Sequence, residues 1–153
     1  MRPFWVGLNG QGQGVQPRQG GDPMSFDVFL SCFQNGEPAT FRRALLERAF
    51  GSIITDRSNP EQWVLEGGST LYLDEGDEIS GFSVNRPPDY DEFWQAIMET
   101  LRQTSSVFYW PGGGCVVANI EVAKHMPEDF IEGLGEPTVV TDPSEILELI
   151  ENS

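Results

Sequence analysis

Residues 63–85, WVLEGGSTLYLDEGDEISGFSVN, decide the fold class of this chain. Apolar and polar residues alternate in three short segments of this stretch, which are separated by Gly67-Gly68 and by residues 74–77 (DEGD). Alternation with a period of two is typical of a strand with one buried face, and tight turns of this composition join antiparallel strands. The stretch therefore predicts an antiparallel meander.

Gly81 interrupts the alternation in the last segment of the meander. Ile79, Phe82 and Val84 are the apolar residues there, and they cannot all lie on one face of a regular strand. An isolated glycine in a strand often marks a bulge, where one extra residue shifts the pattern. We therefore expect a bulge at Gly81.

Further strands are predicted on both sides of the meander. Residues 26–33 (FDVFLSCF) are almost continuously apolar and precede a turn sequence that begins at Asn35-Gly36, which indicates a buried strand. Residues 106–110 and 115–119 are two apolar segments joined by a glycine loop, which is typical of a hairpin. A short strand is also expected at residues 138–141.

Helices are predicted where apolar residues recur every three or four positions after a capping residue. Asp89 precedes the clearest of these patterns, and Thr40 precedes a second one. A short helix is expected after Pro127, and a C-terminal helix after Asp142. The whole pattern predicts a single α+β domain over residues 24–153, with a mostly antiparallel sheet and three to four helices.

Residues 1–23 differ in composition from the rest of the chain. They contain six Gly, three Pro and four Gln, and their apolar residues follow neither a helical nor a strand period. We expect a disordered N-terminal extension here. The alternative is that the natural start of the protein is Met24, so that this segment lies upstream of it.

The chain is strongly acidic. Its 153 residues include 24 Asp and Glu against 9 Lys and Arg, for a formal net charge of −15. Nucleic-acid phosphates and anionic membranes attract Lys and Arg, so this charge argues against both as partners and favours a basic protein. With two cysteines and no apolar run of 18 residues, the sequence predicts neither a disulfide framework nor a membrane span, and we expect a cytoplasmic protein.

The densest acidic clusters are the candidate partner-binding residues. They are Asp74, Glu75, Asp77 and Glu78 in the second turn of the meander, Asp89, Asp91 and Glu92 at the start of the clearest helix, and Glu145, Glu148 and Glu151 near the C-terminus. Trp110, beside the glycine loop, is the candidate aromatic anchor, because Trp is enriched among residues that dominate binding energy. The alternatives are that the acidic residues serve solubility and that Trp110 belongs to the core.

No motif in the sequence indicates a catalytic residue, a metal site or a cofactor. The loop at Gly112-Gly113-Gly114 lacks the Lys and Ser/Thr of a phosphate-binding P-loop. Cys115 and His125 are surrounded by no known Cys-His signature, and the carboxylates around Gly76 do not follow the spacing of an EF-hand. We therefore expect no catalytic residues, no metal and no cofactor, although the sequence leaves the question of enzymatic activity open.

Several segments together carry a resemblance to known proteins. They are Met24-Ser-Phe-Asp-Val-Phe-Leu, Asn35-Gly-Glu-Pro with Phe41, Phe93-Trp94, Tyr109-Trp-Pro-Gly-Gly-Gly and Glu145-Ile-Leu. Over nearly all of residues 24–153 the chain resembles an uncharacterised family of small acidic bacterial α+β proteins. In general character it is similar to the immunity proteins that neutralise bacterial polymorphic toxins.

Two functions from different classes follow from these observations. The first is a non-enzymatic binding protein, most concretely an immunity-type inhibitor of a basic bacterial toxin domain, whose acidic face would occupy a groove shaped for phosphates. The second is a small enzyme or ligand-binding domain with an aromatic-lined pocket. The pocket residues would be Trp63, Tyr72, Trp94, Tyr109 and Trp110.

Overall fold

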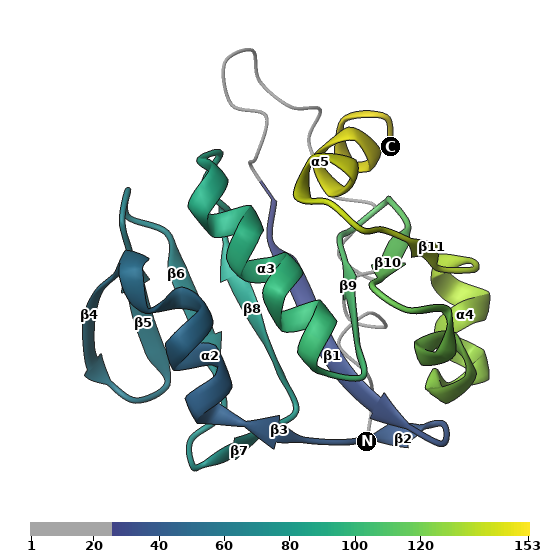
Figure 1. Ribbon diagram of the computed structural model, residues 1–153, viewed down its shortest axis with the longest axis horizontal. Helices are drawn as coiled ribbons and strands as arrows, with labels where there is room; N and C mark the ends of the chain where they lie inside the picture. Colours follow the sequence, from purple (N-terminus) through teal and green to yellow (C-terminus); the bar gives the residue numbers. More distant parts are fainter. Residues whose placement is uncertain (1–25) are drawn as a thin grey trace.

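The computed structural model describes residues 26–153, which form one α+β domain (Figure 1). The extension predicted at residues 1–23, and the start at Met24, lie outside the described residues. The strands are β1 (Val28–Gln34), β2 (Glu37–Pro38), β3 (Phe41–Arg42), β4 (Ile54–Asn59), β5 (Gln62–Leu65), β6 (Thr70–Leu73), β7 (Glu78–Ile79), β8 (Gly81–Asn85), β9 (Ser106–Tyr109), β10 (Cys115–Val117) and β11 (Thr138–Val139). The helices are α2 (Arg43–Phe50), α3 (Asp91–Gln103), α4 (Glu128–Leu134) and α5 (Pro143–Glu151), with the short 3₁₀ helices η1 (Gly51–Ile53) and η2 (Ile120–His125).

One large sheet organises the domain. Its strand order is β11-β10-β9-β1-β8-β6-β5-β4, with β2 paired to one end of β1. Every pair is antiparallel except β10 with β11, which is parallel, so the predicted mostly antiparallel sheet is confirmed. The meander appears as β5, β6 and β8, and β9 and β10 form the hairpin predicted on either side of the glycine loop.

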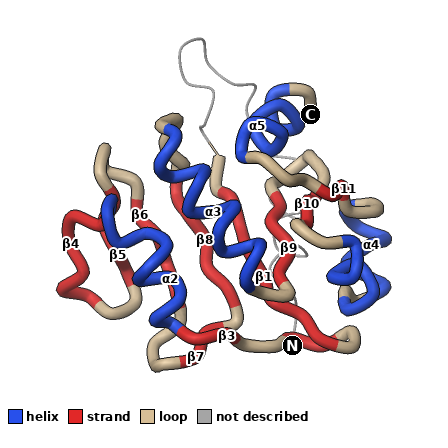
Figure 2. The backbone as a smooth tube through the Cα atoms, in the orientation of Figure 1, coloured by secondary structure: helices blue, strands red, loops and turns tan. Residues whose placement is uncertain are grey.

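Strand β1 lies in the middle of the sheet and is buried on both faces. Val28, Leu30 and Cys32 point into the core under α2, α3 and α5, whereas Phe29 and Phe33 point into a second core under η2 and α4. Figure 2 shows α2, α3 and α5 as one helical layer in front of the sheet. Burial on both faces explains why residues 26–33 lack the polar alternation of the meander.

The opposite face of β4, β5, β6 and β8 is covered by no helix among residues 26–153. Tyr72, which is 41% exposed, lies there between Gln62 and Ser83 in the strand register. Trp63 and Leu71, one residue away along their strands, are fully buried on the helical side. The alternation of buried and exposed residues along β5 and β6 is therefore that of a sheet with one covered face.

The expected bulge at Gly81 is wrong. Residue pairing between β1 and β8 is regular there, and the chain instead leaves the sheet at Ser80, so that Ile79 pairs with Phe41 in a separate two-stranded ribbon of β3 and β7. The glycine serves close packing: a Cβ at Gly81 would overlap the carbonyl oxygen of Leu30 in β1.

Two helices begin later than their predicted caps. Helix α3 begins at Asp91 with Tyr90 in the N-cap position, so Asp89 is not its cap. Helix α2 begins at Arg43 because Phe41 is held in the β3–β7 ribbon, and the Thr40 hydroxyl donates to Glu78. The Asp142 cap of α5 is confirmed, since its carboxylate accepts the backbone N–H of Ser144.

None of the helices in residues 26–153 combines the length and apolar character that a membrane crossing requires.

Candidate partner-binding surface

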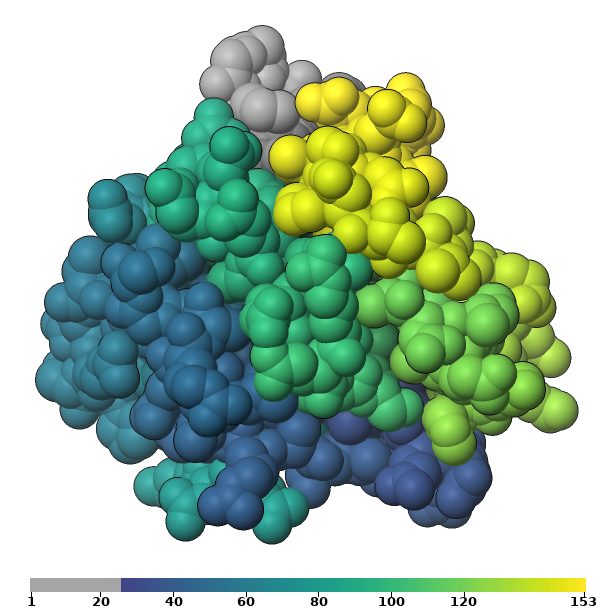
Figure 3. All heavy atoms as spheres, viewed as in Figure 1, coloured from purple at the N-terminus to yellow at the C-terminus, as the bar shows by residue number. Residues whose placement is uncertain are grey.

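The structure separates the three predicted acidic clusters into two regions. The cluster at residues 74–78 lies beside the β3–β7 ribbon at the lower edge of Figure 1, whereas α3 begins at the upper edge, close to α5. The clusters of α3 and α5 therefore belong to one helical layer. Figure 3 shows the surfaces of α2, α3 and α5 side by side on the same face of the molecule.

Arg43 holds the acidic turn at residues 74–78 in place. Its guanidinium donates to the carbonyl oxygens of Asp74 (2.9 Å) and Pro60, and its backbone N–H donates to the carbonyl of Asp77 (2.8 Å). The carboxylate of Asp74 accepts from Ser80, so part of this cluster stabilises its own turn. Among residues 26–153, no group of three or more His, Cys, Asp and Glu side chains is placed to hold a metal ion.

A groove of about 500 Å³ runs between α3 and α5, and we call it the α3–α5 groove. Its lining residues are Asp91, Trp94, Gln95, Met98, Glu99 and Arg102 from α3, and Asp142, Pro143, Ser144 and Leu147 from the start of α5. Asp91, one member of the α3 cluster, therefore lines the same groove as the residues that begin α5, although the hydrogen bond from α3 to that segment is made by Arg102, which bonds Thr141. Met98 and Trp94 are buried beneath it, and the half-buried Leu147 forms its wall.

The charge of the α3–α5 groove is not balanced. Arg102, its one cation, donates to the carbonyl oxygen of Thr141 (2.9 Å) and lies 4.0 Å from the carboxylate of Glu99. Asp91 makes no ion pair with any residue that the structure describes. Hydrogen bonds from Ser144 lower the pKa of Asp142, so this carboxylate stays charged at neutral pH. An excess of negative charge therefore remains on the groove.

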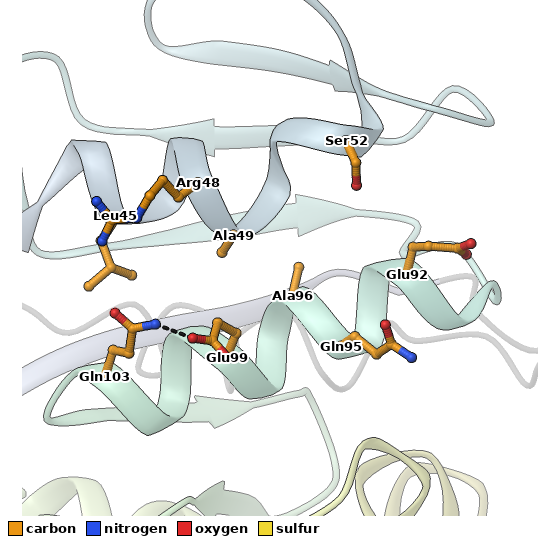
Figure 4. Close-up of a pocket in the computed structure, with 9 residues that line it drawn as sticks. All are labelled: Leu45, Arg48, Ala49, Ser52, Glu92, Gln95, Ala96, Glu99 and Gln103. Atoms are coloured by element: carbon orange, nitrogen blue, oxygen red, sulfur yellow. Dashed lines mark hydrogen bonds between the residues drawn. The ribbon is translucent and has the colours of Figure 1, made fainter.

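A second groove, of about 370 Å³, lies on the other side of α3 (Figure 4). In this α2–α3 groove, Ala49 and Ala96 face each other across the gap, and the side chain of Arg48 extends along α2 toward Leu45. Glu92 closes one end, and Gln103 donates to Glu99 at the other. Gln95 and Glu99 line both grooves, so they form the exposed ridge of α3 between them.

The acidic residues of α5 differ in what they contact: one of them stabilises the start of the helix, and the other two are exposed to solvent. Glu145 accepts from the backbone N–H of Thr141 (2.7 Å) and from its hydroxyl, which stabilises the entry into the helix. Glu148 and Glu151 are exposed and make no ion pair within residues 26–153. Asp89 is also exposed, in the loop before α3.

Trp110 does not offer the exposed aromatic anchor expected from the sequence. It is 2% exposed and belongs to the core on the helical side of the sheet. Its indole N–H donates to the Ser153 hydroxyl (3.1 Å) at the C-terminus, and the glycine loop folds over the ring so closely that a Cβ at Gly113 would overlap it. Gly113 serves this close approach, and Gly112 adopts a positive φ of 73° that favours glycine, which explains both residues beside a tryptophan.

The five aromatic residues proposed to wall a pocket do not converge. Trp63, Trp94 and Trp110 are buried on the helical side of the sheet. Tyr109 is buried in the core on the opposite side, and Tyr72 is exposed on the open part of the sheet. No single pocket can be walled by residues on both faces of a sheet, so this expectation is wrong.

The side chains of Cys115 and His125 each form their hydrogen bond with a different residue and not with each other. The Cys115 thiol faces the carbonyl oxygen of Gly135 (3.7 Å), and the Nδ1 of His125 accepts the backbone N–H of Asn35 (3.1 Å) in the β1–β2 turn. Burial, together with the charge of Glu136, raises the pKa of Cys115 to about 12. Both cysteines are buried free thiols.

We expect Cys115 to react with iodoacetamide at least about a hundredfold more slowly in the folded protein than in the unfolded chain, because a buried thiol with a raised pKa is rarely ionised. Mass spectrometry of timed samples at pH 8 measures this rate, with 6 M guanidinium chloride providing the unfolded reference. A His125→Ala variant is the control. Fast alkylation that this variant abolishes would contradict a structural role for the pair.

Sequence reasoning did not single out several polar residues that line the two grooves, among them Gln95, Glu99, Arg102 and Asp142. A signal for two of them was present, since Asp91, Gln95 and Glu99 recur every four residues and so share one face of a helix. Asp142 was recognised only as a cap. Its place beside α3 depends on the packing of α5, which no local pattern encodes.

Comparisons with known proteins found no match: no family model, no curated protein and no solved structure is similar to this chain.

Proposed function

We propose that this protein is a non-enzymatic binding protein that uses the acidic surface of α3 and α5 to bind a basic protein. The most concrete form of this proposal is an immunity-type inhibitor of a basic bacterial toxin domain. The observation that carries it is the concentration of negative charge on one helical layer. This acidic helical surface consists of Asp91, Glu92, Glu99, Asp142, Glu145, Glu148 and Glu151.

The balance of charge on this surface supports a cationic partner. Arg48 and Arg102 are the cations that line the two grooves, and Arg102 is already engaged by Thr141 and Glu99. Excess charge of one sign creates a field that attracts an oppositely charged protein and orients it during the encounter. A toxin that binds nucleic acid has a basic groove for phosphates, and carboxylates on a helical layer can occupy such a groove.

The state of the cysteines is compatible with the cytoplasmic location that we include in the proposal. Cys32 and Cys115 are both free thiols. Disulfides are rare in the cytosol, where thiols are kept reduced, and they are common in secreted proteins of this size. A cytoplasmic inhibitor would meet its toxin either before export or after entry.

The test measures association with the protein encoded by the gene next to that of this chain. Stopped-flow fluorescence should give an association rate that falls about tenfold or more between 0.05 and 0.5 M NaCl, because salt screens the steering field. A rate that does not change with salt would remove the electrostatic basis of the proposal.

Two matched variants locate the surface. Glu148→Lys/Glu151→Lys on α5 and Glu75→Lys/Asp77→Lys in the turn change the net charge by the same amount, and all four residues are exposed. We expect the α5 variant to slow association about tenfold and the turn variant less than about threefold, since steering depends on charges near the contact. Equal effects would mean that only net charge matters and would contradict the assignment to the helical surface.

A further inference from the structure

We propose that the α3–α5 groove receives an arginine side chain from the basic partner. This inference rests on the proposed function and makes it more specific, because it assigns the contact to one groove and to one kind of side chain. The alternative site on the same layer is the α2–α3 groove, on the other side of the α3 ridge.

Carboxylates surround the α3–α5 groove from both helices. Asp91 and Glu99 lie two helical turns apart on α3, and Asp142 stands across from them at the start of α5. A planar guanidinium has five N–H donors in a fixed fork that matches the two oxygens of one carboxylate, while the remaining carboxylates of the groove attract it through their charge. An ammonium group is a compact point charge and gains less from such an arrangement.

The apolar residues of the groove suit the rest of an arginine side chain. Leu147 is half-buried and forms the α5 wall of the groove, and the buried Met98 of α3 also lines the groove. Arginine packs its methylene stem along apolar surface while its charged end contacts polar groups. The groove combines both kinds of surface, which distinguishes it from the acidic turn at residues 74–78.

The two grooves differ in their excess of carboxylates. The α3–α5 groove is lined by Asp91, Glu99 and Asp142 against Arg102, whereas the α2–α3 groove is lined by Glu92 and Glu99 against Arg48. Both arginines are exposed, and Arg102 is already engaged by Thr141 and Glu99. The larger excess of negative charge therefore favours the α3–α5 groove for an incoming arginine.

The neighbouring residues Asp91 and Glu92 allow a matched test. Both are exposed in the first turn of α3, but Asp91 lines the α3–α5 groove and Glu92 lines the α2–α3 groove. Asp91→Asn and Glu92→Gln each remove one negative charge with little change in shape. Both also lose a similar favourable interaction with the helix N-terminus, so their effects on folding should match.

The probe is a synthetic 15-residue helical peptide with three arginines spaced four residues apart, and its counterpart carries citrulline, the neutral analogue of arginine, at the same positions. Binding to the full chain is measured by fluorescence anisotropy at 0.05 M NaCl and mapped by NMR amide shifts. We expect the citrulline peptide to bind at least tenfold more weakly. Asp91→Asn should weaken binding of the arginine peptide at least fivefold, and Glu92→Gln less than twofold, with shifts concentrated on α3 and the start of α5.

Equal losses in the two variants, or shifts confined to the α2–α3 groove or to residues 74–78, would overturn the assignment to this groove. Equal binding of the two peptides would overturn the choice of arginine. Neither result would contradict the proposed function, which depends on the salt dependence of association with the neighbouring gene's product. Circular dichroism of both variants confirms that differences in binding do not come from unfolding.

Discussion

Replacement of Gly81 by alanine should lower the free energy of unfolding by about 3 kcal/mol, since forced overpacking of a tight interior costs about this much. The added methyl group would overlap the carbonyl oxygen of Leu30 and would lie 3.0 Å from its carbonyl carbon. Both atoms are backbone, so no side-chain rotation can relieve the overlap. Strands β1 and β8 must separate there, at the centre of the sheet. Urea denaturation followed by tryptophan fluorescence measures the change.

Gly51→Ala is the control for this prediction. Gly51 has helical backbone angles (φ −55°, ψ −35°) at the end of α2, and a Cβ there would meet nothing within 4 Å. Alanine should leave stability unchanged or raise it slightly, because it restricts the unfolded chain. If the Gly81→Ala variant were as stable as the Gly51→Ala variant, this result would contradict the conclusion that β8 approaches β1 too closely to leave room for a side chain at residue 81.

Truncation of Trp110 to alanine should destabilise the fold by roughly 3 to 5 kcal/mol, the usual cost of removing a buried large aromatic side chain. The ring is 2% exposed, lies 6.1 Å from the ring of Phe108 and bonds Ser153 after α5. Its loss would leave a cavity and release the end of α5. Small domains are stable by only about 5 to 15 kcal/mol, so a large share of the stability would be lost. The melting temperature by calorimetry gives the direct measurement.

Tyr72→Ala provides the comparison for Trp110→Ala. Tyr72 is an aromatic residue of the same sheet, but it is 41% exposed on the uncovered face. Its truncation should cost less than about 1 kcal/mol, because an exposed side chain loses little packing. If the Trp110→Ala variant were stable but no longer bound its partner, this result would contradict the core role and would support Trp110 as the aromatic anchor of the partner-binding surface.

These results bear on how binding experiments should be interpreted. Trp110 packs against the glycine loop and bonds Ser153, two residues beyond the end of α5, and α5 forms one wall of the α3–α5 groove. A core substitution there would disturb the groove without any direct contact to a partner. Variants of Asp91, Glu92, Glu148 and Glu151 avoid this problem because these side chains are exposed.

The amino-acid sequence by itself determined several of the main elements of the fold. Period-two alternation in residues 63–85 predicted the meander, the continuous apolar run at residues 26–33 predicted the central strand, and Asp142 predicted the start of α5. Each of these features depends on side-chain spacing or on a cap within a few residues. Local sequence therefore carries the information that they need.

Only the tertiary structure decided which surfaces those elements form. The acidic residues of α3 and α5 are some fifty positions apart in the chain, and they share one layer because both helices bury apolar residues against the same face of the sheet. The parallel pairing of β10 with β11, the burial of Trp110 and the break at Ser80 likewise depend on contacts between distant segments. Such contacts arise when the chain closes around its core, so no spacing along the sequence could reveal them.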